Sequence, residues 1–118
     1  MSEPDATGQA ATAEDTAAIQ VRDEGHLDEL VADGVVFVDF YADWCGPCVA
    51  METILERVAA ETGVPVATVD VETEESLAAQ YDVRGVPAIL LFSDGEVVER
   101  RTGLQDQADL AALAESYA

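Results

Sequence analysis

Residues 35–48 read VVFVDFYADWCGPC, and this stretch decides the fold. Its first half, residues 35–41, is almost wholly apolar and rich in β-branched and aromatic side chains, which predicts a strand covered on both faces. Cys45 and Cys48 then open a segment whose apolar residues recur every three or four positions, a helical pattern that stops at Gly63. A buried strand that runs into a helix through a Cys-x-x-Cys turn predicts a redox pair in an α/β protein.

The sequence on either side of this stretch alternates strand and helix patterns. Strands are expected at 19–21, 66–71, 88–92 and, after the Asp94-Gly95 turn, around 97–98. Helices are expected after an Asp23 cap, after a Thr73 cap, and over about 106–117, with Leu110, Leu113, Ala114 and Tyr117 on the buried side of the last one. The middle strands require a parallel right-handed crossover and the late hairpin is antiparallel, so we expect a mixed central sheet of about five strands flanked by about four helices.

Residues 1–18 differ in composition from the remainder of the chain. They are rich in Ala, Thr, Asp, Glu and Gly, with no aromatic residue and, apart from Met1 and Pro4, no apolar side chain larger than Ala. Such a segment buries too little surface to offset its ordering entropy, so we predict a disordered tail, with a frayed helix as the alternative. Residues 19–118 are predicted to form one domain.

The charge of the chain excludes several classes of partner. Asp and Glu total 25, Lys and Arg total 5, and the net charge is −20; all five basic residues are Arg. Binding to nucleic acid or to an anionic membrane needs clustered cations, so neither is expected. No apolar run is long enough to span a bilayer and the N-terminus lacks the pattern of a signal peptide, so a cytoplasmic protein is expected.

The spacing of the two cysteines suits thiol–disulfide chemistry. Residues i and i+3 in the first turn of a helix share a face, so their sulfurs can bond without large backbone movement. Cys45 lies at the helix N-terminus, where the dipole favours a thiolate, and Cys48 lies one turn deeper and should be shielded. A zinc site needs about four ligands. Besides the two cysteines the sequence offers one histidine, His26, and no second Cys pair, so no metal site is expected. A purely structural disulfide would close a very short loop and stabilise little.

Two further residues stand out near this pair. Asp39 interrupts the apolar strand, and burial would raise the pKa of its carboxyl group. It is either a strand-end carboxylate that reaches solvent or a general base near Cys48, acting through a water molecule. Pro87 precedes a buried strand, and the residues alone do not distinguish a cis from a trans Val86-Pro87 bond.

Taken in order, these motifs resemble the thioredoxin family. The match consists of VDFYA at 38–42, WCGPC at 44–48, GVP at 85–87, the Phe92 to Glu96 segment with its Asp94-Gly95 turn, and Gly103, and it extends from Ile19 to Tyr117. The resemblance implies a thioredoxin fold and a general protein dithiol–disulfide oxidoreductase. In such an enzyme Cys45 is the nucleophile that forms a mixed disulfide with the substrate, and Cys48 resolves it.

The resemblance also implies roles for other residues and for partners. Asp39 would be the buried general acid or base, and Pro87 the family's cis-proline beside the sulfurs. The apolar rim that docks substrates would comprise Trp44, Gly46, Pro47, Val71, Val86 and Gly103. No bound cofactor is implied beyond the Cys45–Cys48 disulfide. The implied partners of this monomer are disulfide-containing proteins and a flavin-dependent thioredoxin reductase. A disulfide isomerase or oxidase of the same fold, or a binding module with idle cysteines, is the alternative; Gly46-Pro47 argues for a reductant.

The sequence departs from the family pattern at three positions. Thr68 stands where many members carry a lysine near the buried Asp, so we expect Asp39 to lack a cation and its pKa to be raised. Val49 replaces a frequent lysine after the second cysteine, which removes another cation that could tune the thiols. Thr53 replaces a helix-kinking proline, so we expect a straighter helix. The absence of lysine, with abundant acidic residues, resembles proteins of salt-loving archaea, and predicts stability that falls on desalting. A merely acidic mesophilic protein is the alternative.

Overall fold

The computed structural model describes residues 18–118, so all but the last residue of the predicted tail lies outside the described part. The chain order is strand β1 (Ile19–Gln20), helix α2 (Glu24–Val31), β2 (Val35–Tyr41), α3 (Gly46–Thr62), β3 (Val66–Asp70), α4 (Glu75–Gln80), β4 (Ala88–Ser93), β5 (Glu96–Thr102) and α5 (Gln107–Tyr117). The predicted α/β fold and order of elements are confirmed within this part of the chain.

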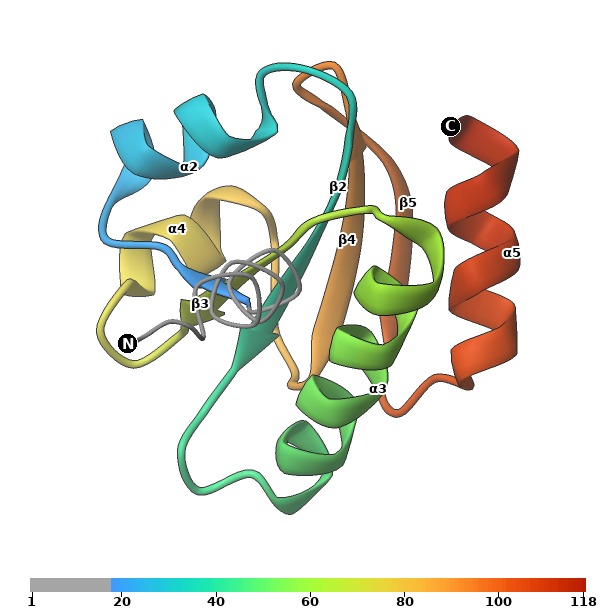
Figure 1. Ribbon diagram of the computed structural model, residues 1–118. Helices are drawn as coiled ribbons and strands as arrows, with labels where there is room; N and C mark the ends of the chain where they lie inside the picture. The colour runs from blue at the N-terminus through green and yellow to red at the C-terminus, as the bar shows by residue number, and fades with distance from the viewer. Residues whose placement is uncertain (1–17) are drawn as a thin grey trace, which may run out of the picture.

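The strands form one mixed sheet with β2 at its centre. Their order is β1-β3-β2-β4-β5. Strands β1, β3 and β2 are parallel, whereas β4 runs antiparallel to β2 and β5 antiparallel to β4. Helices α3 and α5 cover one face of the sheet, and α2 and α4 lie on the other (Figure 1). This is the thioredoxin-type architecture that the sequence predicts.

Strand β2 contributes to both hydrophobic cores because successive side chains point to opposite faces. Val36, Val38 and Phe40 pack with the helices α2 and α4. Phe37 packs with α3 and α5 on the opposite face. Asp39 therefore belongs to the α3 face and is buried there beneath the helix that carries the cysteines.

Local capping explains where most helices begin and end. The Asp23 carboxylate accepts the backbone N–H of His26 at 2.8 Å and caps α2, as predicted. Gly63 ends α3 in the left-handed conformation, with φ of +79°, which costs glycine little. Helix α3 continues through Thr53 as one element.

Two details of the helices differ from expectation. Helix α4 starts at Glu75 with Glu74 as its cap, because the Thr73 hydroxyl donates to the backbone carbonyl of Asp70 instead of capping the helix. In α5, Leu110, Ala111 and Ala114 are the buried residues. Tyr117 is exposed because its hydroxyl reaches the Glu99 carboxylate on the neighbouring edge strand β5, at 2.6 Å.

Among residues 18–118, no helix combines the length and apolar composition that crossing a membrane requires.

Candidate active site

The first turn of α3 carries a disulfide. Cys45 and Cys48 are bonded through their sulfurs, with their Cα atoms 5.3 Å apart. Cys45 is the N-cap residue of α3, and its sulfur accepts the backbone N–H of Cys48 at 3.2 Å. The sulfur of Cys45 thus occupies the position where the helix dipole and an N–H group favour a thiolate once the bond is reduced.

Both cysteine residues are nearly buried in this oxidised form. Cys45 is 5% exposed and Cys48 4%, so the expected shielding of Cys48 is present but Cys45 is shielded equally. The reason is that the disulfide holds both side chains in one small cluster with Ala42. Gly46, Pro47 and Trp44 surround the pair at the surface, and Trp44 is 71% exposed.

Asp39 is the buried carboxyl group near this turn. It is 1% exposed, and its Oδ1 atom has no hydrogen-bond partner among the described residues. Loss of hydration raises the pKa of Asp39 from 3.8 to about 7, and the negative charge of Glu52 adds to the rise. The sequence-based expectation of a raised pKa is confirmed, and the alternative of a carboxylate that reaches solvent at the strand end is wrong. A group that titrates near neutrality can both accept and donate a proton at physiological pH.

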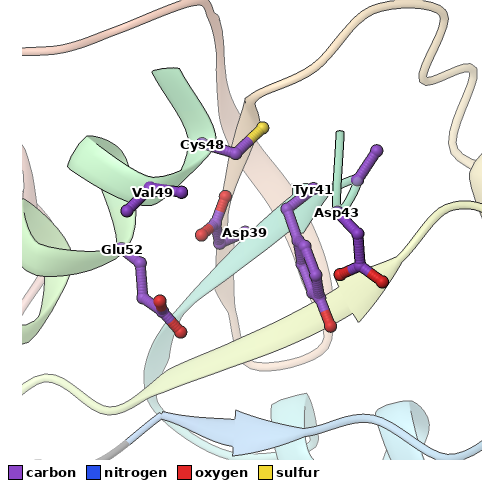
Figure 2. A pocket seen from close by; sticks show the side chains of 7 residues that line it. Asp39, Tyr41, Asp43, Cys48, Val49 and Glu52 are labelled. Atoms are coloured by element: carbon purple, nitrogen blue, oxygen red, sulfur yellow. The ribbon is translucent and has the colours of Figure 1, made fainter. Parts of the chain in front are cut away.

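A cleft of about 280 Å³ connects Asp39 with Cys48 (Figure 2). We call it the acidic cleft. It is lined by Asp39, Tyr41, Ala42, Asp43, Cys48, Val49 and Glu52. Water takes about 30 Å³ per molecule in the liquid, so several molecules fit and can relay a proton between the thiol and the carboxyl group. Glu52 and Tyr41 are absent from the sequence-based set, although Glu52 lies four residues beyond Cys48 and Tyr41 two beyond Asp39, which places each on the same face as its partner.

A second, more apolar hollow lies beside Trp44. This apolar groove encloses about 130 Å³ and is lined by Trp44, Val71, Val83, Arg84, Gly85 and Val86. It brings together three members of the predicted docking rim, Trp44, Val71 and Val86, and the two valines also pack against the cysteine cluster. Gly85 belongs to the GVP motif at 85–87 but was not assigned to the docking rim, and Val83 and Arg84 were missed because nothing in their local sequence marks them as part of a surface hollow.

The remaining predicted site residues lie close to this groove or on the first turn of α3. The Val86-Pro87 peptide bond is cis, as the family resemblance implies. The carbonyl of Pro87 accepts the N–H of Gly103 at 2.8 Å, which brings Gly103 from the end of β5 to the proline. Gly46 and Pro47 are exposed at the start of α3.

The residues that could hold a metal ion are dispersed. Within residues 18–118, no group of three or more His, Cys, Asp or Glu side chains is arranged to hold one. The imidazole of His26 instead accepts the backbone N–H of Arg22 at 3.1 Å, a local contact at the start of α2.

Comparison with known proteins agrees with this geometry. The family model described as thioredoxin matches residues 17–116. The chain belongs to the thioredoxin family. Thioredoxin of Chlamydia trachomatis serovar D is 38% identical over 100 residues, which cover 84% of this chain and 98% of that protein. Thioredoxin of Staphylococcus aureus is 36% identical over 103 residues, covering 86% and 98%. A solved mutant thioredoxin from Halobacterium salinarum NRC-1 superposes with a TM-score of 0.83 at 46% identity, covering 86% of this chain and 91% of its own.

Membership of the thioredoxin family establishes the class of reaction. The chain is a protein-disulfide oxidoreductase, and its redox group is the Cys45–Cys48 disulfide. Thioredoxins carry out this exchange with their own cysteines and need no bound cofactor. The family works with thioredoxin reductase and with disulfide-containing substrates.

Proposed function

We propose that this chain is a general reductant of protein disulfides, with Cys45 as nucleophile, Cys48 as resolving thiol and Asp39 as proton acceptor and donor. One observation carries the proposal: a cysteine pair at a helix N-terminus opens, on the side of Cys48, into a cleft that contains a buried carboxyl group of pKa about 7.

The exchange proceeds in two displacements. The Cys45 thiolate attacks one sulfur of the substrate disulfide, so that the other substrate sulfur leaves as a thiolate and takes up a proton. Cys48 then attacks the Cys45 sulfur of the mixed disulfide, which releases the second substrate thiolate and closes the Cys45–Cys48 bond. Two electrons pass to the substrate, and the protein is left oxidised, in the form that the structure holds.

Asp39 serves the second displacement. The Cys48 thiol must lose its proton before it attacks, and the ionised Asp39 carboxylate, on the same cleft, accepts that proton through a water molecule. With a pKa of about 7, a substantial fraction of Asp39 is ionised at neutral pH, and the proton returns to solvent afterwards.

The apolar groove and the first turn of α3 bind the substrate chain. Trp44, Val71 and Val86 offer apolar surface next to the cysteines, and Pro87, Gly103, Gly46 and Pro47 complete the docking rim. Contacts of this kind are tolerant of sequence, which suits a reductant of many proteins.

The setting of this reaction completes the proposal. A flavin-dependent thioredoxin reductase returns two electrons to the disulfide, and the cycle runs in the cytoplasm, where thiols are kept reduced. The net charge of −20, the absence of lysine and the similarity to the Halobacterium protein support a halophilic archaeal source.

Reduction of insulin by dithiothreitol, followed as turbidity in concentrated salt, tests the proposal. The wild-type chain should accelerate precipitation and Cys45→Ser should abolish the acceleration. Reduced Cys48→Ser, mixed with insulin after dithiothreitol has been removed, should accumulate stable mixed disulfides. A wild-type chain without effect would favour a binding module. A reduction potential well above that of the glutathione pool would favour an oxidase or isomerase.

A further inference from the structure

The acidic cleft concentrates negative charge, and no cationic side chain of the described residues lines it. Its lining includes the three carboxyl groups of Asp39, Asp43 and Glu52. None of the five arginines, all of which lie in the described part of the chain, lines the cleft, and the sequence has no lysine. A ligand that enters this space therefore gains most if it carries positive charge.

A second observation points to a ligand in the same place. The Oδ1 atom of Asp39 is buried without a hydrogen-bond partner among residues 18–118. Figure 2 shows the carboxyl group of Asp39 directed from β2 into the space between Cys48 and Glu52 of α3. Burying a carboxyl group without a partner is costly, and an incoming donor would recover part of that cost.

The shape of the cleft suits a long basic side chain better than a metal ion. Ions such as Ca²⁺ need several oxygen atoms converging at about 2.3–2.6 Å. No three acidic, His or Cys side chains of residues 18–118 are arranged in that way. A lysine ammonium group offers three donors to separated carboxylates, and its apolar stem can lie along Val49, which is 65% exposed. The volume equals that of roughly nine liquid water molecules, enough for such a side chain.

We propose that the acidic cleft receives a lysine side chain of the disulfide substrate, from a position close to the reactive cysteine of that substrate. The inference rests on the proposed reductant function and adds a specificity to it. The cleft shares Cys48 with the redox pair, whereas the apolar groove includes the Trp44 side chain next to Cys45. A docked substrate would contact the groove with apolar residues and the cleft with its lysine. The ammonium group would keep Asp39 ionised while Cys48 loses its proton.

A peptide series tests the proposal directly. The substrates would be symmetric disulfide dimers of a short peptide. In each peptide, one of the three positions before or after the cysteine carries lysine, norleucine or glutamate. The norleucine peptides report reduction itself, and the lysine peptides add only the charge. We expect kcat/KM to be about fivefold higher for lysine than for norleucine at one or more positions, and lower for glutamate, at constant ionic strength.

A pair of variants on α3 assigns the effect to the cleft. Glu52→Gln removes a carboxylate of the cleft and should reduce the lysine preference to about twofold or less. Glu56→Gln removes the same charge one turn further along α3, at an exposed position outside the cleft, and should retain the full preference. Each variant loses one negative charge, so the two have equal net charge and a difference between them reports the position of that charge alone.

The possible results distinguish failure of the lysine preference from failure of the proposed reductant function. If norleucine peptides are reduced and lysine brings no preference at any position, the inference fails and the reductant function stands. Equal loss in the two variants would assign the effect to overall surface charge and overturn the inference. Rates that rise equally for all peptides when potassium replaces choline would identify the occupant as a free cation, with the same consequence. Failure to reduce any peptide would instead contradict the reductant function.

Discussion

Asp39 and Thr68 are neighbours across strands β2 and β3, yet no hydrogen bond joins their side chains. The Thr68 hydroxyl donates to the side-chain carbonyl of Gln20 on β1, at 3.3 Å, and the hydroxyl of Tyr41 donates to the same oxygen at 3.1 Å. The Thr68 hydroxyl, on the residue paired with Asp39 in the sheet, is thus directed toward the edge strand β1 and not toward Asp39. Asp39 is left with burial as the dominant influence on its pKa, which rises to about 7.

The first prediction concerns stability. Because the folded-state pKa of Asp39 is raised from 3.8 to about 7, the folded protein binds this proton more tightly than the unfolded chain does. Its contribution to stability is therefore present at low pH and is lost as the pH rises from about 4 to about 7. In the oxidised protein, Asp39→Asn should gain about 2–3 kcal/mol relative to wild type between pH 5 and pH 9. Guanidinium unfolding at both pH values measures this; a difference independent of pH would contradict it.

The second prediction concerns the resolving step. If Asp39 accepts the proton of Cys48, the rate of product release from the mixed disulfide should rise with pH through about 7. Asp39→Asn should slow this step about a hundredfold and remove the rise of its rate with pH, while formation of the mixed disulfide is much less affected. Rapid-quench single-turnover kinetics separate the two steps, with Glu56→Gln as the control. An unchanged pH profile in Asp39→Asn would exclude Asp39 as the base.

A third prediction tests what the missing cation does. Thr68→Lys introduces a positive charge beside Asp39 on the same sheet face and should lower the pKa of Asp39 by about one to three units from its present value. Thr68→Val removes the hydroxyl without adding charge and should leave the pKa close to about 7. Carbon-13 NMR titration of the carboxyl resonance compares the two. Equal pKa values in both variants would show that charge at this position does not reach Asp39.

The fourth prediction concerns substrate docking. Trp44→Ala removes the exposed aromatic side chain of the apolar groove and should lower kcat/KM for protein substrates roughly tenfold. The thermal stability should change little, since Trp44 is 71% exposed. Leu104→Ala provides a matched control, because Leu104 is 56% exposed and lines neither the groove nor the acidic cleft. Similar losses in the two variants would argue against a specific docking groove.

The fifth prediction follows from the net charge of −20. At about 3 M potassium chloride the Debye length is below about 3 Å, so repulsion among surface carboxylates is nearly cancelled. Transfer to about 0.1 M salt restores that repulsion and should lower the melting temperature by several degrees. Calorimetry across a salt series measures the effect, with choline chloride to separate screening from specific cation binding. A melting temperature that is equal or higher at low salt would favour an acidic mesophilic protein.

Local patterns in the sequence were sufficient to predict most of the fold. The apolar run of β2, the three-and-four spacing of α3 and the Asp94-Gly95 turn each depend on interactions between near neighbours. The errors occur where a polar side chain has a second possible partner. The Thr73 hydroxyl donates to the carbonyl of Asp70, three residues earlier, instead of capping α4, and the Tyr117 hydroxyl reaches Glu99 on β5, which is distant in the sequence.

The sequence by itself determined the redox chemistry. Two cysteines three residues apart, after a buried strand and at the start of a helix, are sufficient to place both sulfurs on one helical turn. That relation is local in the chain, so it is readable without knowing what packs against the turn.

Only the tertiary structure decided the surroundings of those sulfurs. It brought Asp39 from β2, Glu52 from α3 and Asp43 from the connecting loop to one cleft, turned Thr68 toward Gln20, and placed residues 83–86 beside Trp44. The physical reason is that the pKa of a buried carboxyl group and the shape of a groove depend on loss of hydration and on neighbours from other elements. Both are set only when the sheet and its helices have packed together.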